Sequence, residues 1–255
     1  MISAGIDIGS RTVKVVVVSE RHTVKRIAEN TFDPLSVCTS LLEGLEYDTI
    51  TATGYGRHLF GQHFECNIIS EIKAFSMGVR AVAVTSRTIL DIGGQDIKAI
   101  SLDQGGNMRK FEMNDKCSAG TGRFLEIMAL ALGCSVREFG ELALTADNAE
   151  NVSSMCTVFA ESEVISLLAK GAPRNEIALG IHKSIIGRAK SMLQRVSLEE
   201  SLAFVGGVSL NRCIVCLLEE SLGVRAYVPD APQLMGALGC ALHGLGQKET
   251  AWESS

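Results

Sequence analysis

The segment DIGSRTVK, residues 7–14, returns 84 positions later almost unchanged as DIGGQDIK, residues 91–98. Each copy joins two runs rich in β-branched residues, which predicts two strands connected by a tight turn. In both copies a glycine followed by serine or glycine lets the backbone turn where a larger side chain would block it. We expect the aspartate before that glycine to end a strand and face the turn. The sequence therefore predicts a duplicated β-hairpin with strands at residues 2–8, 13–18, 88–92 and 97–102.

Two further glycine turns and several helices follow. FVGGVSLN, residues 204–211, comes after a short apolar strand and opens a predicted helix through residues 214–222. QLMGALGCAL, which starts at Gln233, begins the last predicted helix. Longer helical patterns cover residues 124–132, 158–170 and 176–196. Strands and helices in this order predict an α/β protein with a cleft between two repeated units.

Composition limits the possible functions. The chain has 255 residues, of which 46% are hydrophobic and 21% charged, so it is long enough for one large domain or two lobes. Its net charge of -5 and the lack of a Lys/Arg stripe argue against a nucleic-acid partner. Asp7 interrupts the first apolar run, which argues against a signal peptide or a membrane span and favours a cytoplasmic location. In a reducing compartment the eight cysteines are expected to be thiols or metal ligands.

Glycine turns beside carboxylates point to a nucleoside triphosphate and its metal. Backbone N–H groups in such turns form a concave array of donors for phosphate oxygens. Asp7, Asp91 and Asp96 offer the oxygen ligands that Mg²⁺ prefers, directly or through water. A single copy would be explained by a simple hairpin turn, whereas two copies favour two turns that clamp one polyphosphate from opposite sides. The pattern is neither a P-loop nor, after the first strand, a dinucleotide-binding glycine fingerprint.

The order of the two phosphate turns and VGGVSLN resembles that in the actin, sugar kinase and heat-shock chaperone superfamily of ATPases. The resemblance implies two ribonuclease H-like lobes with a nucleotide cleft between them, and it assigns VGGVSLN to the adenosine. We expect the first lobe to comprise residues 1–85, completed by the C-terminal helix 236–246. Residues 86–235 are expected to form the second lobe, with the second phosphate turn, the adenosine turn and two motif cysteines.

Four longer motifs resemble those of a narrower family. They are TGYGR at 53–57, DIGGQDIK at 91–98, MNDKCSAGTGRFLE at 113–126 and SSMCTVFAESEVISL at 153–167. These motifs are similar to those of the activator ATPases of 2-hydroxyacyl-CoA dehydratases, a family shared with the ATPase subunits of benzoyl-CoA reductases. The resemblance implies an ATP-hydrolysing protein that delivers a low-potential electron in a transient complex with a dehydratase or reductase. Ferredoxin or flavodoxin is the implied electron donor.

Two cysteines, Cys117 and Cys156, lie within these motifs. Each comes before a predicted helix, where free N–H groups and the helix dipole favour a thiolate. An iron–sulfur cube usually needs four thiolates, and the two motifs supply two. The resemblance implies a homodimer with one [4Fe-4S] cluster, ligated by Cys117 and Cys156 of each subunit. The alternative is that both are small buried side chains.

The resemblance also implies roles for the residues around the nucleotide. Asp7, Asp91, Gln95 and Asp96 are the expected catalytic residues, which organise Mg²⁺ and the attacking water. The residues expected to bind ATP or ADP are Gly9, Ser10, Arg11, Thr12, Val13, Lys14, Gly93, Gly94, Gln95, Gly206, Gly207, Asn211, Gln233 and Gly236. Arg11 departs from the family, whose members commonly have a small Ser/Thr-type residue there. Its long cation either pairs with phosphate or points to solvent.

Other patterns carry weaker signals. Cys213 and Cys216 form a C-x-x-C that is typical of half a zinc site or a redox pair, but no second such pair accompanies it, so we interpret them as core-facing or incidental. His58 and His182 have no carboxylate at a diagnostic spacing. Two alternative functions stay open at this point, a small-molecule kinase and a non-redox ATP-binding regulatory module. A kinase needs an extra substrate-binding lobe, for which 255 residues leave little room.

Overall fold

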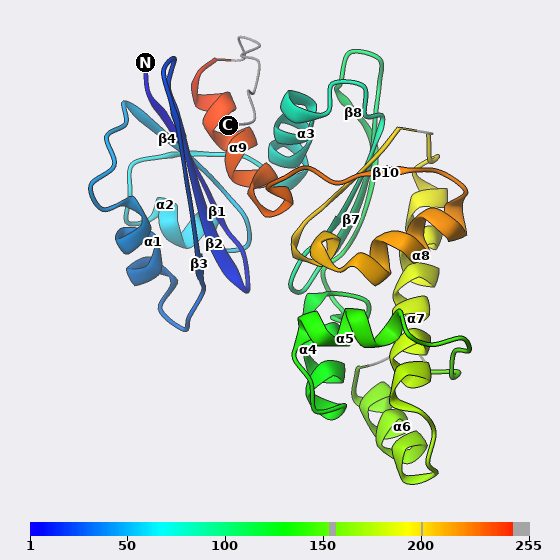
Figure 1. Ribbon diagram of the computed structural model, residues 1–255. Helices are drawn as coiled ribbons and strands as arrows, with labels where there is room; N and C mark the ends of the chain where they lie inside the picture. Colours follow the sequence, from blue (N-terminus) through cyan, green and yellow to red (C-terminus); the bar gives the residue numbers. More distant parts are fainter. Residues whose placement is uncertain (153–156, 200, 247–255) are drawn as a thin grey trace.

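The computed structural model describes residues 1–152, 157–199 and 201–246. Within these residues it has two five-stranded sheets with helices on both faces, as Figure 1 shows. The first sheet contains β1 (Ser3–Ile8), β2 (Thr12–Val18), β3 (Thr23–Glu29), β4 (Thr49–Thr53) and β5 (Asn67–Ile68). The second contains β6 (Thr88–Ile92), β7 (Ile97–Leu102), β8 (Met108–Asn114), β9 (Leu202–Val205) and β10 (Ala226–Tyr227).

The two sheets repeat one topology. The strand order is β3-β2-β1-β4-β5 in the first sheet and, counted from the matching edge, β8-β7-β6-β9-β10 in the second. In each sheet an antiparallel hairpin is followed by a strand that pairs parallel with the hairpin's first strand. The register also repeats, because Asp7 lies opposite Lys14 and Asp91 lies opposite Lys98. The predicted duplicated hairpin is therefore confirmed.

A glycine with positive φ follows the strand beside each of these aspartates. Gly54 has φ 89° and lies against the Asp7 carboxylate and the backbone of the first turn. Gly206 has φ 85° and lies in the same way against Asp91. A side chain at either position would overlap with the neighbouring backbone, so glycine meets both a conformational and a steric requirement. The TGYGR turn is thus the counterpart, in the first sheet, of the third glycine turn in the second.

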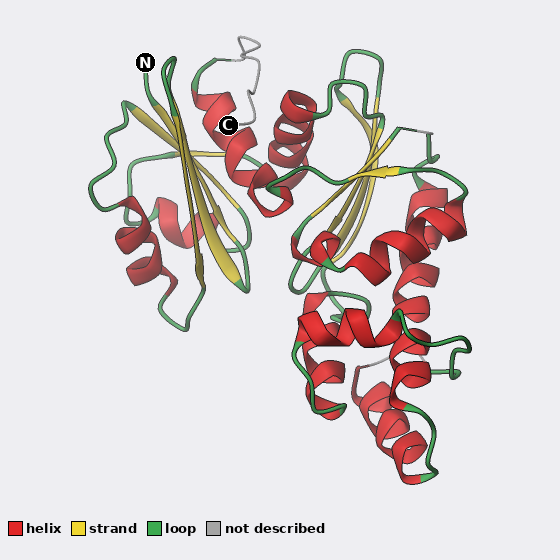
Figure 2. Cartoon of the chain, viewed as in Figure 1, coloured by secondary structure: helices red, strands yellow, loops and turns green. Residues whose placement is uncertain are grey.

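Two helices lie between the sheets and connect them. Figure 2 shows α3 (Glu71–Val82) and α9 (Met235–Gly244) side by side in this position. Helix α9 packs on β1, β2 and β4, whereas α3 contacts β7 and β8. One apolar cluster joins residues of both sheets and both helices, including Val16, Phe75, Ile100 and Leu238. The C-terminal helix thus returns to the first sheet, and its start at Met235 is close to the predicted position.

The remaining helices cover the outer faces. Helices α1 (Pro34–Leu42) and α2 (Arg57–Gly61) pack on the far face of the first sheet. The second sheet carries α4 (Gly122–Ala131), α5 (Val136–Ala143), α6 (Thr157–Ala169), α7 (Arg174–Arg195) and α8 (Arg212–Leu222). These five helices share one core with the outer face of that sheet. In Figure 1, α4 and α6 extend furthest from the sheet.

The structure confirms the predicted helices, with ends that shift by one or two residues. Short 3-10 turns at Gly207–Leu210 and Pro232–Leu234 precede α8 and α9. The lobe boundaries at residues 85 and 235 stay a prediction. None of the described helices is long and apolar enough to cross a membrane.

Helices α3 and α9 approach each other at glycines. A Cβ at Gly239 would overlap with the backbone carbonyl of Ala74, and a Cβ at Gly78 would overlap with that of Met235. The helix backbones therefore touch directly, which leaves no room for a methyl group.

We predict that Gly239→Ala destabilises the protein by about 2 kcal/mol or more, because the added methyl forces these helices apart. The matched control is Gly187→Ala in α7, where an added Cβ meets nothing within 4 Å. That change should stabilise by up to about 1 kcal/mol through helix propensity. Urea unfolding of both variants measures the difference. Equal effects of the two substitutions would show that the α3–α9 contact is not tight.

Candidate functional site

A cavity of about 1220 Å³ lies between the two sheets, at the turns of the two hairpins. Its wall combines both predicted phosphate turns with the third glycine turn and the first residues of α3. The predicted residues that line it are Asp7, Gly9, Ser10, Arg11, Thr12, Lys14, Asp91, Gly93, Gly94, Gln95, Asp96, Gly206, Gly207, Asn211 and Gln233. The fold thus brings distant parts of the chain to one cavity.

The first hairpin turn is held by short hydrogen bonds. The Gly9 N–H donates to the Thr12 carbonyl at 3.1 Å. From the end of β3, the Asn30 side chain donates to the Gly9 carbonyl at 2.7 Å, and the Asn30 N–H donates to the Arg11 carbonyl at 2.8 Å. Four backbone groups of the turn are satisfied in this way, so the turn has a defined shape before any ligand binds.

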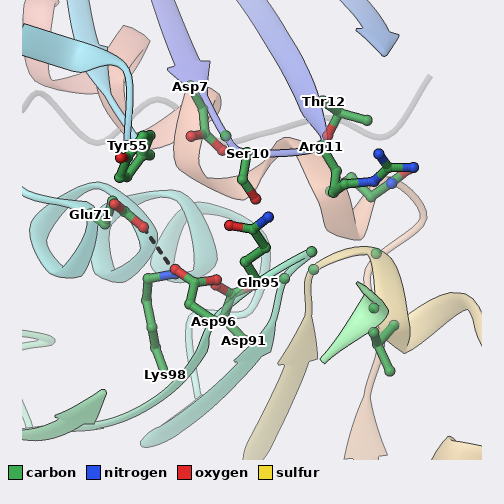
Figure 3. Close-up of a pocket in the computed structure, with 18 of the residues that line it drawn as sticks. Asp7, Ser10, Arg11, Thr12, Tyr55, Glu71, Asp91, Gln95, Asp96 and Lys98 are labelled. Atoms are coloured by element: carbon green, nitrogen blue, oxygen red, sulfur yellow. Dashed lines mark hydrogen bonds and ion pairs between the residues drawn. The ribbon is translucent and has the colours of Figure 1, made fainter. Parts of the chain in front are cut away.

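The second turn faces the first across the cavity. The Gly93 N–H donates to the Asp96 carbonyl at 2.9 Å, the same bond that closes the first turn. Figure 3 shows the side chains of Ser10 and Gln95 pointing toward each other from the two turns. A ligand between them would contact both sheets at once.

A buried lysine lies at the centre of the carboxylates. Lys98 Nζ is 2.9 Å from Glu71 Oε2, 3.0 Å from Asp91 Oδ2 and 2.6 Å from Asp96 Oδ2. Only 2% of its side chain is exposed, and the ion pair with Glu71 is visible in Figure 3. In the first hairpin the equivalent pair is looser, with Lys14 Nζ 3.5 Å from Asp7 Oδ2. The second turn therefore carries the stronger charge cluster.

Burial and neighbouring charges shift the pKa values of Asp91, Glu71 and Lys98. Burial raises the pKa of both Asp91 and Glu71, and although Lys98 opposes this, repulsion between the carboxylates adds to it. Burial by itself lowers the pKa of Lys98, but attraction to the three carboxylates outweighs it and holds that pKa well above its usual range. Lys98 is thus a fixed cation. Arg57 lies 3.7 Å from the other oxygen of Glu71, so three carboxylates against two cations leave one negative charge uncompensated when all are ionised.

The third glycine turn is held by a buried histidine on α7. Asn211 caps α8, since its Oδ1 accepts from the Ile214 N–H at 3.2 Å. Its amide nitrogen therefore faces His182 Nε2, 3.0 Å away. His182 Nδ1 lies 2.7 Å from the Ala178 carbonyl, so Nδ1 carries the proton and Nε2 accepts. Every polar atom of both side chains has a partner, which fixes the position of Asn211 at the cavity.

Two residues of the predicted nucleotide set do not line the cavity. Val13 is fully buried in the core of the first sheet, because alternation along β2 turns its side chain away from Thr12 and Lys14. Gly236 lies behind Asp7, where an added Cβ would be 3.0 Å from the carboxylate. Its lack of a side chain makes room for Asp7.

Glu71 and Lys98 were missed by the sequence analysis as site residues. Lys98 matches Lys14 at the end of the repeated segment, and this offset was a usable signal. Glu71 gave no such signal, because it begins α3 after an unremarkable serine cap. Only the packing of α3 against the second sheet brings it to Lys98.

Of the two motif cysteines, the structure describes Cys117. Cys117 is half-buried in the loop before α4 and does not line the cavity, and Cys156 lies outside the described residues. The residues that follow these cysteines are joined, since Ser118 Oγ and Thr157 Oγ1 are 3.2 Å apart. Among the described residues, no three His, Cys, Asp or Glu side chains form a group suited to a metal ion. As predicted for a core-facing residue, Cys213 is buried, whereas Cys216 is exposed.

Comparison with known proteins gives the family. A model of the BadF/BadG/BcrA/BcrD ATPase family matches residues 4–244. The chain belongs to this family. The resemblance inferred from the motifs is therefore confirmed. One family relative, the activator of lactoyl-CoA dehydratase from Anaerotignum propionicum, is 41% identical over 253 residues, which are 95% of this chain and 97% of that protein.

Solved structures of the family share the fold. Component A of (R)-2-hydroxyglutaryl-CoA dehydratase from Acidaminococcus fermentans matches with a TM-score of 0.87 and 36% identity, over 95% of this chain and 97% of that one. The activator of 2-hydroxyisocaproyl-CoA dehydratase from Clostridium difficile, solved with bound ADPNP, matches with a TM-score of 0.86 and 37% identity over 100% of both chains. The predicted α/β fold of the actin, sugar kinase and chaperone ATPase type is confirmed.

The buried His182 predicts a specific loss of stability in acid. Burial lowers the pKa of His182 to about 4. In the unfolded chain this histidine is protonated near pH 6.5, whereas in the folded chain it is protonated only near pH 4. Stability is therefore present above pH 6.5 and is lost as the pH falls through this window, by up to about 3 kcal/mol. Urea unfolding of wild type and His182→Gln at several pH values measures this. We expect the variant to lose less stability in acid, and parallel profiles would contradict the assignment.

Proposed function

We propose that this chain is an ATP-hydrolysing activator that delivers a low-potential electron to a partner 2-hydroxyacyl-CoA dehydratase or related reductase. One observation carries the proposal. Two glycine turns, each preceded by a buried aspartate, face each other across one cavity, in a chain whose full length is similar to activators of that class. The partner class follows from these relatives, which are activators of CoA dehydratases.

In this proposal the chain's own residues hold the nucleotide. The N–H groups of the turns at Gly9 and Gly93 bind the polyphosphate from opposite sides, and the turn at Gly206 bounds the adenosine. The negative charge left around Lys98 is what a bound Mg²⁺ would balance, with Asp7 as a further oxygen ligand. Gln95 orients the attacking water from the second turn. ATP and ADP then differ in the contacts that link the two sheets.

A hydrogen bond beside Cys117 supports a shared iron–sulfur site. The Ser118–Thr157 hydrogen bond joins the two cysteine segments, which supports ligands from both, namely Cys117 and Cys156. Because two thiolates per chain make half of a cube's usual set, we propose a homodimer that holds one [4Fe-4S] cluster. When bound, the cluster supplies one-electron transfer at low potential. Ferredoxin or flavodoxin is the proposed electron donor.

Helices α4 and α6 connect the proposed sites. Each begins shortly after a motif cysteine, and the two helices pack together. Helix α4 also reaches the cavity wall through Gly122, Leu125 and Glu126. A movement of the cavity wall on nucleotide exchange therefore has a direct path to the cysteine segments.

We predict that Asp7→Asn and Asp91→Asn each reduce Mg²⁺-dependent ATP hydrolysis by about 100-fold or more, because each removes a charge that organises the metal and water. Phosphate release, measured on variants whose circular dichroism matches wild type, provides the test. Asp103→Asn is the matched control, since Asp103 lies in the β7–β8 turn, where it accepts a hydrogen bond from the Asn107 N–H at 2.9 Å. It should hydrolyse ATP normally. Wild-type rates in both cavity variants would refute the proposed site.

A second prediction concerns iron. Anaerobically purified wild type should contain about four iron atoms per dimer, the content of one cube. Cys117→Ser and Cys156→Ser should each lose nearly all of it. Cys213→Ser should keep it, because burial raises the pKa of the Cys213 thiol to about 12 and disfavours the thiolate that a metal requires. Metal analysis with absorbance near 400 nm makes the measurement. Iron that survives Cys117→Ser but disappears in Cys213→Ser would contradict the assignment.

A further inference from the structure

An ion pair crosses the cavity between the first turn and helix α4. Arg11 Nε is 3.0 Å from Glu126 Oε1, and both residues line the cavity. The other carboxylate oxygen of Glu126 is 3.1 Å from the guanidinium of Arg123, one helical turn earlier on α4. The unusual Arg11 is thus partly exposed but paired, and Glu126 on α4 is its partner.

Helix α4 is also attached to the second turn. The Gly122 N–H donates to the Gly93 carbonyl at 2.9 Å, and the Arg123 N–H donates to the Gly94 carbonyl at 2.8 Å. These two amides belong to the N-terminal turn of α4, so they have no acceptor inside their own helix. The second turn therefore caps α4 through the backbone, and the two elements should move together.

The two turns meet at this same point. An added Cβ at Gly94 would overlap with the side chain of Arg11. The aliphatic part of Arg11 lies at this contact, and because Arg11 lines the cavity, a polyphosphate bound there can reach its guanidinium. A phosphate group is highly charged, and two of its oxygens can accept parallel hydrogen bonds from one guanidinium.

The two attachments of α4 differ in strength. The bonds to the second turn are short backbone hydrogen bonds, whereas the pair to the first turn joins side chains that are 44% and 28% exposed. Exposed ion pairs are weak and screened by salt. Of the two, the Arg11–Glu126 pair is the one that an anionic ligand can break.

We propose that Glu126 is a positioning residue that holds Arg11 against α4 in the nucleotide-free chain, and that Arg11 exchanges Glu126 for a nucleotide phosphate when ATP binds. This inference rests on the proposed ATP site. The exchange releases α4 from the first turn while its backbone bonds keep it on the second. Glu126 keeps a partner in Arg123 after the exchange, so no carboxylate is left unpaired. Because α4 follows the Cys117 loop, nucleotide binding in the cavity changes the contacts of the helix to which that loop is joined.

Isothermal titration of Mg²⁺·ATP into wild type, Glu126→Gln, Arg11→Ser and the double variant tests the exchange. Glu126→Gln should bind ATP about two- to fivefold more tightly, because the competitor for Arg11 has lost its charge. Arg11→Ser should bind more weakly than wild type. In the Arg11→Ser background, Glu126→Gln should have no further effect. The gain from Glu126→Gln should also shrink between about 0.05 M and about 0.5 M salt, as screening weakens the pair.

The matched control is Glu112→Gln, which removes a carboxylate that pairs with Arg195 at 3.2 Å and does not line the cavity. It should leave the ATP affinity unchanged. Unchanged or weaker binding by Glu126→Gln, or the same gain with and without Arg11, would overturn the exchange while leaving the ATP site intact. Absence of ATP binding by wild type would overturn the proposed function together with the exchange. Circular dichroism confirms that each variant is folded.

Discussion

In each sheet, a buried aspartate near the end of a central strand packs against a glycine. The backbone of that glycine is left-handed, a conformation that other residues rarely adopt. Asp7 with Gly54, and Asp91 with Gly206, place one carboxylate at each wall of the cavity. The hairpin turns begin next to these aspartates, and residues of both turns line the same cavity. If either glycine carried a side chain, the strand end and its carboxylate would be displaced, and the opposed turns would no longer define one site.

The remaining architecture holds these two units at a fixed separation. Helices α3 and α9 fill the space between the sheets, and glycines at their crossing bring their backbones into contact. Glu71, the first residue of α3, reaches across to Lys98 on the second hairpin. Helix α4 adds a connection at the cavity wall, since it touches both turns and follows the Cys117 loop. These contacts join the cavity to both the sheet interface and the Cys117 loop.

Much of the fold could be predicted because its signals are local. The hairpins follow from β-branched runs on either side of glycine, and α7 follows from a long amphipathic pattern. Most of the predicted nucleotide residues also line the cavity, because most of them stand in glycine turns that follow strand ends. Val13 was assigned with its neighbours, but strand alternation sends its side chain into the core. The roles of these residues stay predictions.

The sequence alone determined the repeated unit, the strand ends just after Asp7 and Asp91, and the family resemblance, because a repeated segment and long motifs are properties of order along the chain. Only the tertiary structure decided that Glu71 neutralises Lys98, that His182 fixes Asn211, and that Arg11 pairs with Glu126. The last two of these pairs join residues 29 and 115 positions apart. Such contacts depend on how helices pack against sheets, and close packing is decided by the whole core rather than by any local pattern.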